Sequence, residues 1–308
     1  MMRILYIAKH GSGGNDDEGS IAFALGKLGH EVVKVQEFGD RLPLEDLKRM
    51  DQEFSFCLFH KWSNFDFIKR LKCPKAFWYF DLVDWPQDPT LSSRCEARKR
   101  WMAEVTPLVD LGFCTDGDWV ERDQSGKLLV LRQGADERVV GFGEPWKGYT
   151  PIDVLFIGGI KGCGVQRESF VRELQARYGH RFTHFSSGVY GRALANAVAT
   201  SKVVVCPDSP VTDRYWSNRV YVMGGFGACL LHPYCSYLSS NYSSCLPGVY
   251  FYRDREDMYR QLDLLLSEEG INDRKPASEI VLEQVKQNHL YRHRCEELVR
   301  VVKERLKI

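Results

Sequence analysis

Residues 215–231 combine residue types that bind anions with glycines that let a backbone come close to a ligand. Ser217 follows a polar loop that contains proline and is a good N-cap, so we expect a helix over 217–225. The free amides and the positive dipole end at a helix start favour an anion. Arg219 lies in the first turn, where its guanidinium could bind two phosphate oxygens. The segment predicts a phosphate site, with a capped helix and an arginine paired to a surface carboxylate as an equal alternative.

Two further glycine-rich turns could place backbone amides against phosphates. The turn over 9–15 could expose amides to a diphosphate, but it lacks the Lys-Ser/Thr ending of a Walker loop and the full spacing of a dinucleotide fingerprint. A plain connection between a strand and a helix is the commoner explanation of such a turn. The turn over 158–164 contains Lys161 and precedes Arg167 at the start of a helix, which suits a second phosphate contact.

Three side chains are candidates for a general base. Asp81 comes just after an apolar strand, where aromatic neighbours could raise its pKa toward that of a working base. A turn or helix-cap aspartate is the ordinary alternative. Asp84 and His10 are the other candidates. We interpret the carboxylates at 16–18 as first-turn residues that interact favourably with the positive end of a helix dipole. No cluster of side chains in the sequence predicts a metal site.

Length and composition limit the protein classes. With 308 residues and 44% hydrophobic content, the chain can bury a large core and is long enough for about two domains. A net charge of +1 gives no overall electrostatic attraction to nucleic acid or membrane. Ten scattered cysteines without a Cys-x-x-Cys pair read as reduced thiols in a cytoplasmic protein. We expect neither a signal peptide nor membrane insertion, since the first residues run directly into a strand and no apolar stretch reaches spanning length.

Short apolar strands alternate with amphipathic helices, which is typical of parallel α/β layers. In the first half we predict strands at 3–8, 31–35, 55–60, 75–80, 111–114 and 128–132, with helices near 17–29, 63–72 and 93–107. In the second half we predict strands at 153–159, 181–186, 202–206, 228–232 and 249–252, with helices near 166–178, 190–200, 217–225, 255–267, 277–288 and 292–306.

The pattern predicts an α/β protein with two Rossmann-like, doubly wound domains that face a cleft. A Gly-, Pro- and Trp-containing stretch at 141–148 is the expected linker, so the domains are 1–148 and 149–308. The last helix, near 292–306, could return to the first domain. In such folds ligands bind where the strands end, which is where the glycine-rich turns lie.

The order of these motifs resembles glycosyltransferases of GT-B architecture, and most closely the subgroup related to spore maturation protein CgeB (glycosyl transferases group 1). The resemblance rests on 153–159 with Arg167, 217–219 with 227–231, 252–254 and 289–294, and more loosely on 2–7, 78–81 and 133–136. It implies a hexosyltransferase with a nucleoside-diphosphate-sugar donor, a UDP-sugar first, and with neither a metal nor a prosthetic group. The donor residues it implies are Gly13, Gly14, Gly159, Lys161, Arg167, Tyr215, Ser217, Asn218 and Arg219.

The chain departs from the resembled pattern at Val222, where many relatives carry a glutamate that binds the ribose hydroxyls. A valine cannot accept those hydrogen bonds. Either Asp208 or Asp213 binds the ribose instead, or donor binding is weak or altered. A catalytically silent nucleotide- or sugar-binding module is therefore an alternative function.

Basic and aromatic side chains alternate over 60–78 and 94–101, in the domain that would hold the acceptor. Lys61, Trp62 and Trp78 could bind a carbohydrate, with the tryptophans as platforms for sugar rings. Such interleaving could also bind nucleic acid through phosphate contacts and base stacking, although solvated helix faces show the same pattern more often. We place a glycan or a small hydroxylated acceptor first, and a hydroxymethylated DNA base, as in phage DNA modification, second.

Overall fold

The computed structural model describes residues 1–11, 16–37, 53–61, 63–85, 87–147, 150–160, 163–208, 210–240 and 245–308. The chain divides into two compact units. The first unit comprises Met1–Asp84, Ser93–Gln133 and Tyr291–Ile308, and the second comprises Trp85–Ser92 and Gly134–Leu290. Each unit has its own parallel sheet, so each is described by itself.

The first unit contains a six-stranded parallel sheet in the order β2-β1-β3-β4-β5-β6. Its strands are β1 (Arg3–Ala8), β2 (Glu31–Gln36), β3 (Phe56–Phe59), β4 (Lys75–Tyr79), β5 (Leu111–Cys114) and β6 (Leu128–Val130). The strand order reverses between β1 and β3, because β2 lies on the other side of β1. The carboxyl ends of β1 and β3 therefore form the topological switch point where ligands of such sheets bind.

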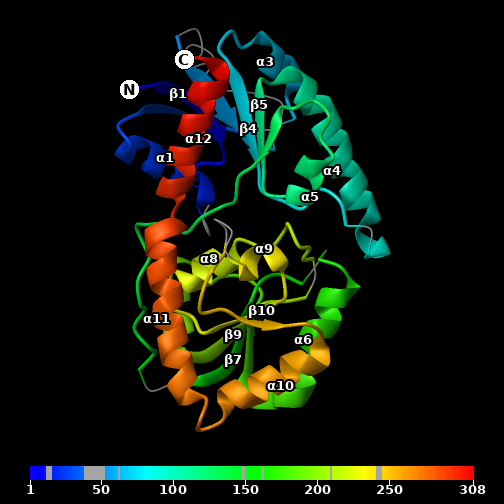
Figure 1. The fold of residues 1–308 in the computed structure, drawn as a ribbon, viewed down its shortest axis with the longest axis vertical. Coiled ribbons are helices and arrows are strands. Elements are labelled where there is room, and N and C mark those ends of the chain that lie inside the picture. Colours follow the sequence, from blue (N-terminus) through cyan, green and yellow to red (C-terminus); the bar gives the residue numbers. More distant parts are fainter. Residues whose placement is uncertain are drawn as a thin grey trace. The chain divides into compact units, whose positions relative to one another are not determined.

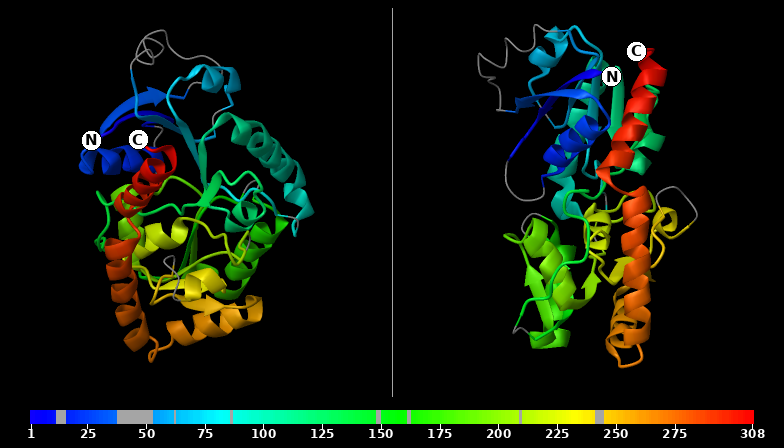
Figure 2. Two further views of the ribbon diagram at one scale, coloured as in Figure 1. Left: turned by 45° about the horizontal axis from the view of Figure 1, so that its top comes forward. Right: turned by 90° about the vertical axis from the view of Figure 1, so that its left-hand side faces the viewer.

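Helices cover both faces of the first sheet because its strands are apolar on both sides. The helices of this unit are α1 (Asp17–Lys27), α3 (Phe65–Arg70), α4 (Ser92–Val105), α5 (Gly117–Glu121) and α12 (Tyr291–Leu306). Ile4 and Tyr6 pack into one core with Leu25 of α1 and Leu298 of α12. Helices α1 and α12 lie side by side on that face, and α4 lies on the other (Figures 1 and 2).

The second unit contains a five-stranded parallel sheet in the order β11-β10-β9-β7-β8. Its strands are β7 (Ile152–Ile157), β8 (Phe182–Phe185), β9 (Ser201–Val205), β10 (Leu230–Pro233) and β11 (Tyr250–Tyr252). Its helices are α6 (Val165–Tyr178), α7 (Gly191–Thr200), α8 (Arg219–Gly224), α9 (Ser236–Ser239), α10 (Arg255–Leu266) and α11 (Ile271–Asn288). One core holds side chains of α7, α8 and α11, and the other holds those of α6 and α10, which lie together in Figure 1. The switch point of this sheet lies between β7 and β9.

The parallel sheets with helices on both faces confirm the predicted doubly wound α/β class. The stretch expected to be a linker, 141–148, is instead packed against the second unit as far as the structure describes it. Gly141 N donates to Gly225 O (2.8 Å), and Trp146 N donates to Thr200 Oγ1 (2.9 Å). These bonds explain why the second unit begins at Gly134 and not near residue 149.

In the described part of the chain, no helix combines the length and the apolar character needed to cross a membrane.

Leu298 tests the contribution of α12 to the first unit. Its side chain is fully buried between α12 and the sheet, so we expect Leu298→Ala to lower the free energy of unfolding by about 2–5 kcal/mol. Urea denaturation followed by circular dichroism measures this change. Arg300→Ala, on the exposed side of α12, is the matched control and should change stability by less than about 0.5 kcal/mol. Equal effects of the two substitutions would contradict the packing of α12.

Candidate functional site

Arg219 is anchored at the switch point of the second sheet. It is the first residue of α8, and its Nε donates to the carbonyl oxygen of Ile157, the last residue of β7, at 2.6 Å. The guanidinium also lies over the ring of Phe156, 5.3 Å from its centroid. These two contacts hold the cation at the carboxyl end of β7, where the glycine-rich turn begins.

Gly158 leaves the room that the Arg219 guanidinium occupies. Its φ of +153° lies in a region that favours glycine, and a Cβ added there would collide with Nη2 of Arg219. The turn is fixed from a second side, because His184 Nε2 donates to Gly158 O at 2.8 Å. Gly159 follows with its backbone exposed. The predicted donor glycine, Gly159, therefore lies one residue beyond the glycine that adjoins Arg219.

The positive charge of Arg219 is not neutralised by a carboxylate in the described part of the chain. Among the residues that the structure describes, no carboxylate forms an ion pair with Arg219. Loss of hydration and then the nearby charge of Arg167 lower the pKa of Arg219 to about 10. Arg167 is itself buried in the first turn of α6. Two arginines that repel each other in a partly dehydrated site favour a bound anion.

The helix after Ser217 is shorter than predicted. It runs over Arg219–Gly224 with Asn218 at the N-cap, and the side chain of Asn218 forms no capping bond. Ser217 Oγ accepts a hydrogen bond from Arg219 N at 3.3 Å, so the serine still binds the first free amide. Tyr215 lies before the helix in a small antiparallel bridge with Thr212. Because α8 has only six residues, its dipole is weak. The Arg219 side chain, and not the helix dipole, would therefore attract an anion.

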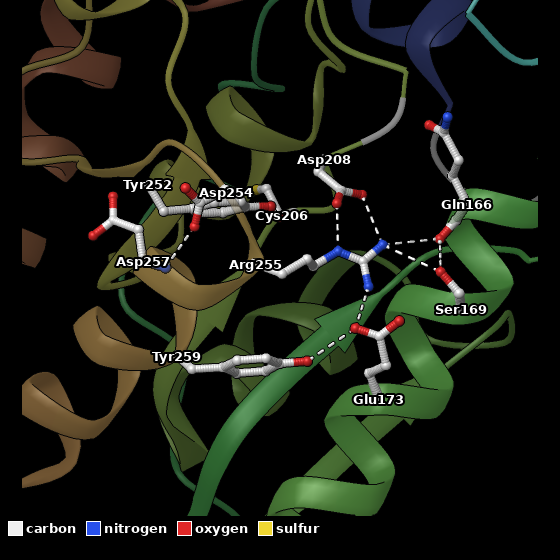
Figure 3. Close-up of polar contacts among 10 residues, drawn as sticks. All are labelled: Gln166, Ser169, Glu173, Cys206, Asp208, Tyr252, Asp254, Arg255, Asp257 and Tyr259. Carbon is white, nitrogen blue, oxygen red and sulfur yellow. Dashed lines mark hydrogen bonds and ion pairs between the residues drawn. The ribbon is translucent and has the colours of Figure 1, made fainter.

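Arg255 connects the loop after β9 to the start of α6 (Figure 3). Its guanidinium binds both carboxylate oxygens of Asp208, one through Nη2 at 3.3 Å, and also Glu173 Oε2 at 2.7 Å. Nη2 donates further to Gln166 O at 3.1 Å. Burial opposes the charge of Arg255, but the two carboxylates outweigh it and raise the pKa. The network fixes the first turns of α6.

The two aspartates expected to replace the missing glutamate at Val222 already have partners. Asp208 is bound to Arg255, and Asp213 Oδ1 accepts from Ser236 N at 3.1 Å. Val222 itself is half-buried and packs against the apolar core under α8. A ribose contact by Asp208 would have to compete with a bidentate ion pair.

In the first unit, a buried hydrogen-bonded chain lies at the carboxyl ends of β1 and β3. His60 Nδ1 must donate to Trp78 O (2.7 Å), because a carbonyl only accepts, so His60 Nε2 accepts from the Tyr6 hydroxyl (2.6 Å). Burial outweighs the bond to Trp78 and lowers the pKa of His60 to about 3. The ring is therefore neutral and serves to fix the strand ends.

His10 presents a ring nitrogen with no partner among the described residues. Its Nε2 must donate to Tyr6 O at 3.2 Å, which leaves Nδ1 as a hydrogen-bond acceptor. That nitrogen is buried and makes no hydrogen bond. Burial, the largest cause, lowers the pKa of His10. The imidazole is thus neutral near pH 7, with one acceptor nitrogen that no described residue uses.

The other two base candidates are held in ion pairs. Asp81 binds Lys61 and also Arg98 Nη2, the latter at 3.4 Å. Asp84 binds Lys99 at 3.0 Å and Arg122 at 3.5 Å. These cations would have to move before either carboxylate could accept a proton.

Two carboxyl groups of the first unit, Glu18 in α1 and Glu37 after β2, were not singled out from the sequence as site residues. Burial, Asp16 and Glu37 raise the pKa of Glu18, while burial raises the pKa of Glu37 against the opposing charges of Lys9 and Lys61. Raised carboxyl pKa values are common at functional sites. Glu37 follows β2 directly, a position at the sheet edge that could have indicated it.

Trp78 is not an acceptor platform, which corrects the expectation from its sequence pattern. Its ring is fully buried, packs edge to face on Tyr291, and donates from Nε1 to Leu131 O at 3.1 Å. Trp101 likewise stacks on Tyr79. Trp78 and Trp101 therefore pack inward, because strand and helix periodicity places them there. Trp62, Lys161, Gly13 and Gly14 lie outside the described residues.

Among the residues with a described placement, no group of three His, Cys, Asp or Glu side chains could hold a metal ion.

A family model described as "Glycosyl transferase-like" matches residues 166–300, which include both Arg167 and Arg219. HepE from Anabaena, solved in complex with UDP-glucose, superposes with a TM-score of 0.62 at 10% identity, over 99% of this chain and 100% of the other. A UDP-forming α,α-trehalose-phosphate synthase from Burkholderia xenovorans gives 0.63 at 10% identity, over 99% and 100%. A mutant of the T4 phage protein BGT, also with UDP-glucose, gives 0.57 at 11% identity over both full chains. No curated protein matches the chain.

At these identities the structural likeness shows the fold, which is the GT-B fold expected from the motif order. The matching family model and this fold together support a glycosyltransferase enzyme.

The neutral state of His60 predicts how stability depends on pH. The unfolded chain protonates this residue near pH 6.5, whereas the folded chain keeps it neutral down to about pH 3. The unfolded state therefore binds more protons in this window, and stability falls as the pH falls, by about 1.4 kcal/mol per unit from His60. Urea unfolding at pH 7 and pH 5 should show a shallower pH dependence in His60→Gln. An equal slope in both proteins would contradict the neutral assignment.

Proposed function

We propose that this protein is a metal-independent glycosyltransferase that moves a hexose from a UDP-sugar to a hydroxyl group of a glycan or small hydroxylated acceptor. The donor diphosphate binds at Arg219 in the second unit, and the proton acceptor lies at the strand ends of the first. The resemblance to the CgeB-related subgroup supports the same assignment through the Ser-x-Arg motif at 217–219.

The observation that supports this proposal most is the guanidinium of Arg219, which forms no ion pair with a carboxylate of the described residues. Its Nε and the Phe156 ring anchor it, and Gly158 leaves room beside it. Arg167 adds a second positive charge nearby. A nucleoside diphosphate offers the negative oxygens that this site lacks, and an arginine binds two of them at once.

The reaction breaks the bond between the anomeric carbon and the diphosphate oxygen and forms a bond between that carbon and the acceptor oxygen. The acceptor hydroxyl gives up its proton, and the nucleoside diphosphate leaves with the electron pair. Arg219 and Arg167 stabilise the charge that develops on the leaving group, which is the largest contribution such a site makes.

We assign the proton acceptor to His10, with Asp81 and Asp84 as alternatives. His10 Nδ1 is a buried acceptor that forms no hydrogen bond with the described residues, while both aspartates are bound by cations. The lowered pKa of His10 keeps its ring unprotonated in slightly acidic solution. A neutral imidazole is a competent general base.

Val222 motivates the second candidate function, a binding module without turnover. A valine offers no hydrogen bond to the ribose, and Asp208 and Asp213 are already engaged. In that case the Arg219 site would still bind a nucleotide, and only turnover would be missing. For the acceptor, the buried ring of Trp78 removes a stacking platform for a DNA base and for a sugar ring alike. A glycan or small molecule stays first because the net charge of +1 gives no overall attraction to nucleic acid.

Replacing Arg219 tests the donor site. Arg219→Ala should reduce the rate of UDP release from UDP-glucose by about a hundredfold or more, because a charge-stabilising donor is lost. A coupled assay for UDP, run with a mixture of simple saccharides as acceptors, measures this. Arg172→Ala removes an exposed arginine from α6 and should leave the rate unchanged.

The outcomes separate the two functions. If wild-type protein binds UDP and shows no turnover, it is the silent module. If Arg219→Ala and Arg172→Ala have equal rates, the donor site is not at Arg219.

Replacing the candidate bases tests the acceptor side. His10→Ala should lower kcat by about a hundredfold to ten-thousandfold, the usual share of a general base. Asp84→Asn, which breaks only ion pairs in this account, should change kcat far less. The wild-type rate should hold from neutral pH to below pH 6.5, since burial lowers the pKa of His10. A large loss in Asp81→Asn with normal kcat in His10→Ala would transfer the role to Asp81.

A further inference from the structure

A hollow lies on the second unit, where β10 and β11 end and α10 begins. Its volume is about 690 Å³, within the range of small-molecule sites. Tyr234, Phe251 and Arg253 line it on the strand side, and Glu256 and Arg260 line it on the helix side. Every one of these residues belongs to the second unit.

An aromatic pair forms the wall of this hollow. The rings of Tyr234 and Phe251 lie 6.2 Å apart with their planes at 77°, and Tyr234 is 53% exposed. The pair is held by the sheet, because Tyr234 N donates to Tyr252 O at 2.7 Å and Phe251 pairs with His232 in the β10–β11 register. A large exposed aromatic surface on a rigid backbone binds an apolar face at little cost in conformational entropy.

The rim carries charges of both signs, with the guanidiniums of Arg253 and Arg260 and the carboxylates of Asp254, Glu256 and Asp257. Asp257 pairs with Arg260 at 2.5 Å and accepts a hydrogen bond from Arg253 N at 3.0 Å. The exposed side chains of Arg253 and Glu256 have no ion pair among the described residues. A phosphate would meet the carboxylate of Glu256, and a cation would meet the guanidinium of Arg253. A neutral ligand with many hydroxyls can use both groups as hydrogen-bond partners.

The hollow is separate from the proposed donor site. Arg255 follows the helix cap Asp254, and its guanidinium turns away from the hollow to bind Asp208 and Gln166 (Figure 3). Figure 3 shows Asp254 and Asp257 on one side of this arginine and the start of α6 on the other. Because β10 and β11 lie on the β9 side of the switch point, the hollow shares the ligand-binding edge of the sheet without overlapping Arg219.

We propose that this hollow is a saccharide-binding subsite, in which a sugar ring lies on Tyr234 and its hydroxyls bind Arg253 and Glu256. The proposal that a saccharide binds here depends only on the hollow and its lining residues. The assignment of that saccharide as part of an extended acceptor or product chain rests on the proposed function.

NMR titration of the full chain with maltotriose, cellotriose and chitotriose, in the absence of nucleotide, tests this proposal. At least one probe should bind wild-type protein, and Tyr234→Ala should weaken it by about tenfold, the effect expected from an aromatic anchor. Tyr190→Ala removes another exposed tyrosine of the same unit and should leave binding unchanged. Thermal unfolding of Tyr234→Ala confirms that the variant is folded.

Arg219→Ala keeps this proposal distinct from the donor site. We expect it to bind the saccharide as wild type does, while UDP binding is lost. Equal binding by Tyr234→Ala and wild type, loss of saccharide binding in Arg219→Ala, or no binding of any probe would overturn the subsite. Saccharide binding that depends on Tyr234 in a protein that does not bind UDP would uphold the subsite and reject the proposed donor.

Discussion

The site in the second unit depends on one constraint: the guanidinium of Arg219 must be held at the carboxyl ends of the strands of a parallel sheet. Placing a cation in a partly dehydrated site is costly unless protein groups or a ligand compensate it. For Arg219 the compensation consists of the Ile157 carbonyl and the Phe156 ring, and no carboxylate of the described chain joins them. Gly158 leaves the space for this arrangement. An anion would complete it, which links the local geometry to a phosphate-bearing donor.

The surrounding polar groups make this constraint rigid. Arg255 ties Asp208 to the first turns of α6, so the loop after β9 and the start of the helix have fixed positions. In the first unit, Tyr6, His60 and Trp78 form a comparable buried chain at the end of its sheet. Such satisfied networks pre-organise a site, since their members need not rearrange when a ligand binds. His10 differs because it retains an unused acceptor nitrogen.

Much of the fold could be predicted because strand and helix periodicities are local. The strands at 3–8 and 111–114 have the predicted bounds, whereas α5 and α9 were missed because they are only five and four residues long. The place of Arg219 in the first turn of a helix was also predictable, since a serine, a favourable residue at a helix start, comes two residues before it. The surroundings of Trp78 and the pairing of Asp208 with Arg255 were not, because contacts between distant parts of the chain decide them. Tyr6 and His60, for example, are 54 residues apart.

The most direct test of the central claim is thermal unfolding of wild-type protein and Gly158→Ala with UDP, UDP-glucose and other nucleoside diphosphates. An added Cβ at Gly158 would displace the Arg219 guanidinium, so the variant should not respond to nucleotide. The account predicts that UDP and UDP-sugars stabilise wild type, by about 2.7 kcal/mol at a hundred times the dissociation constant. No stabilisation of wild type by any nucleoside diphosphate, or the same stabilisation of Gly158→Ala, would contradict it.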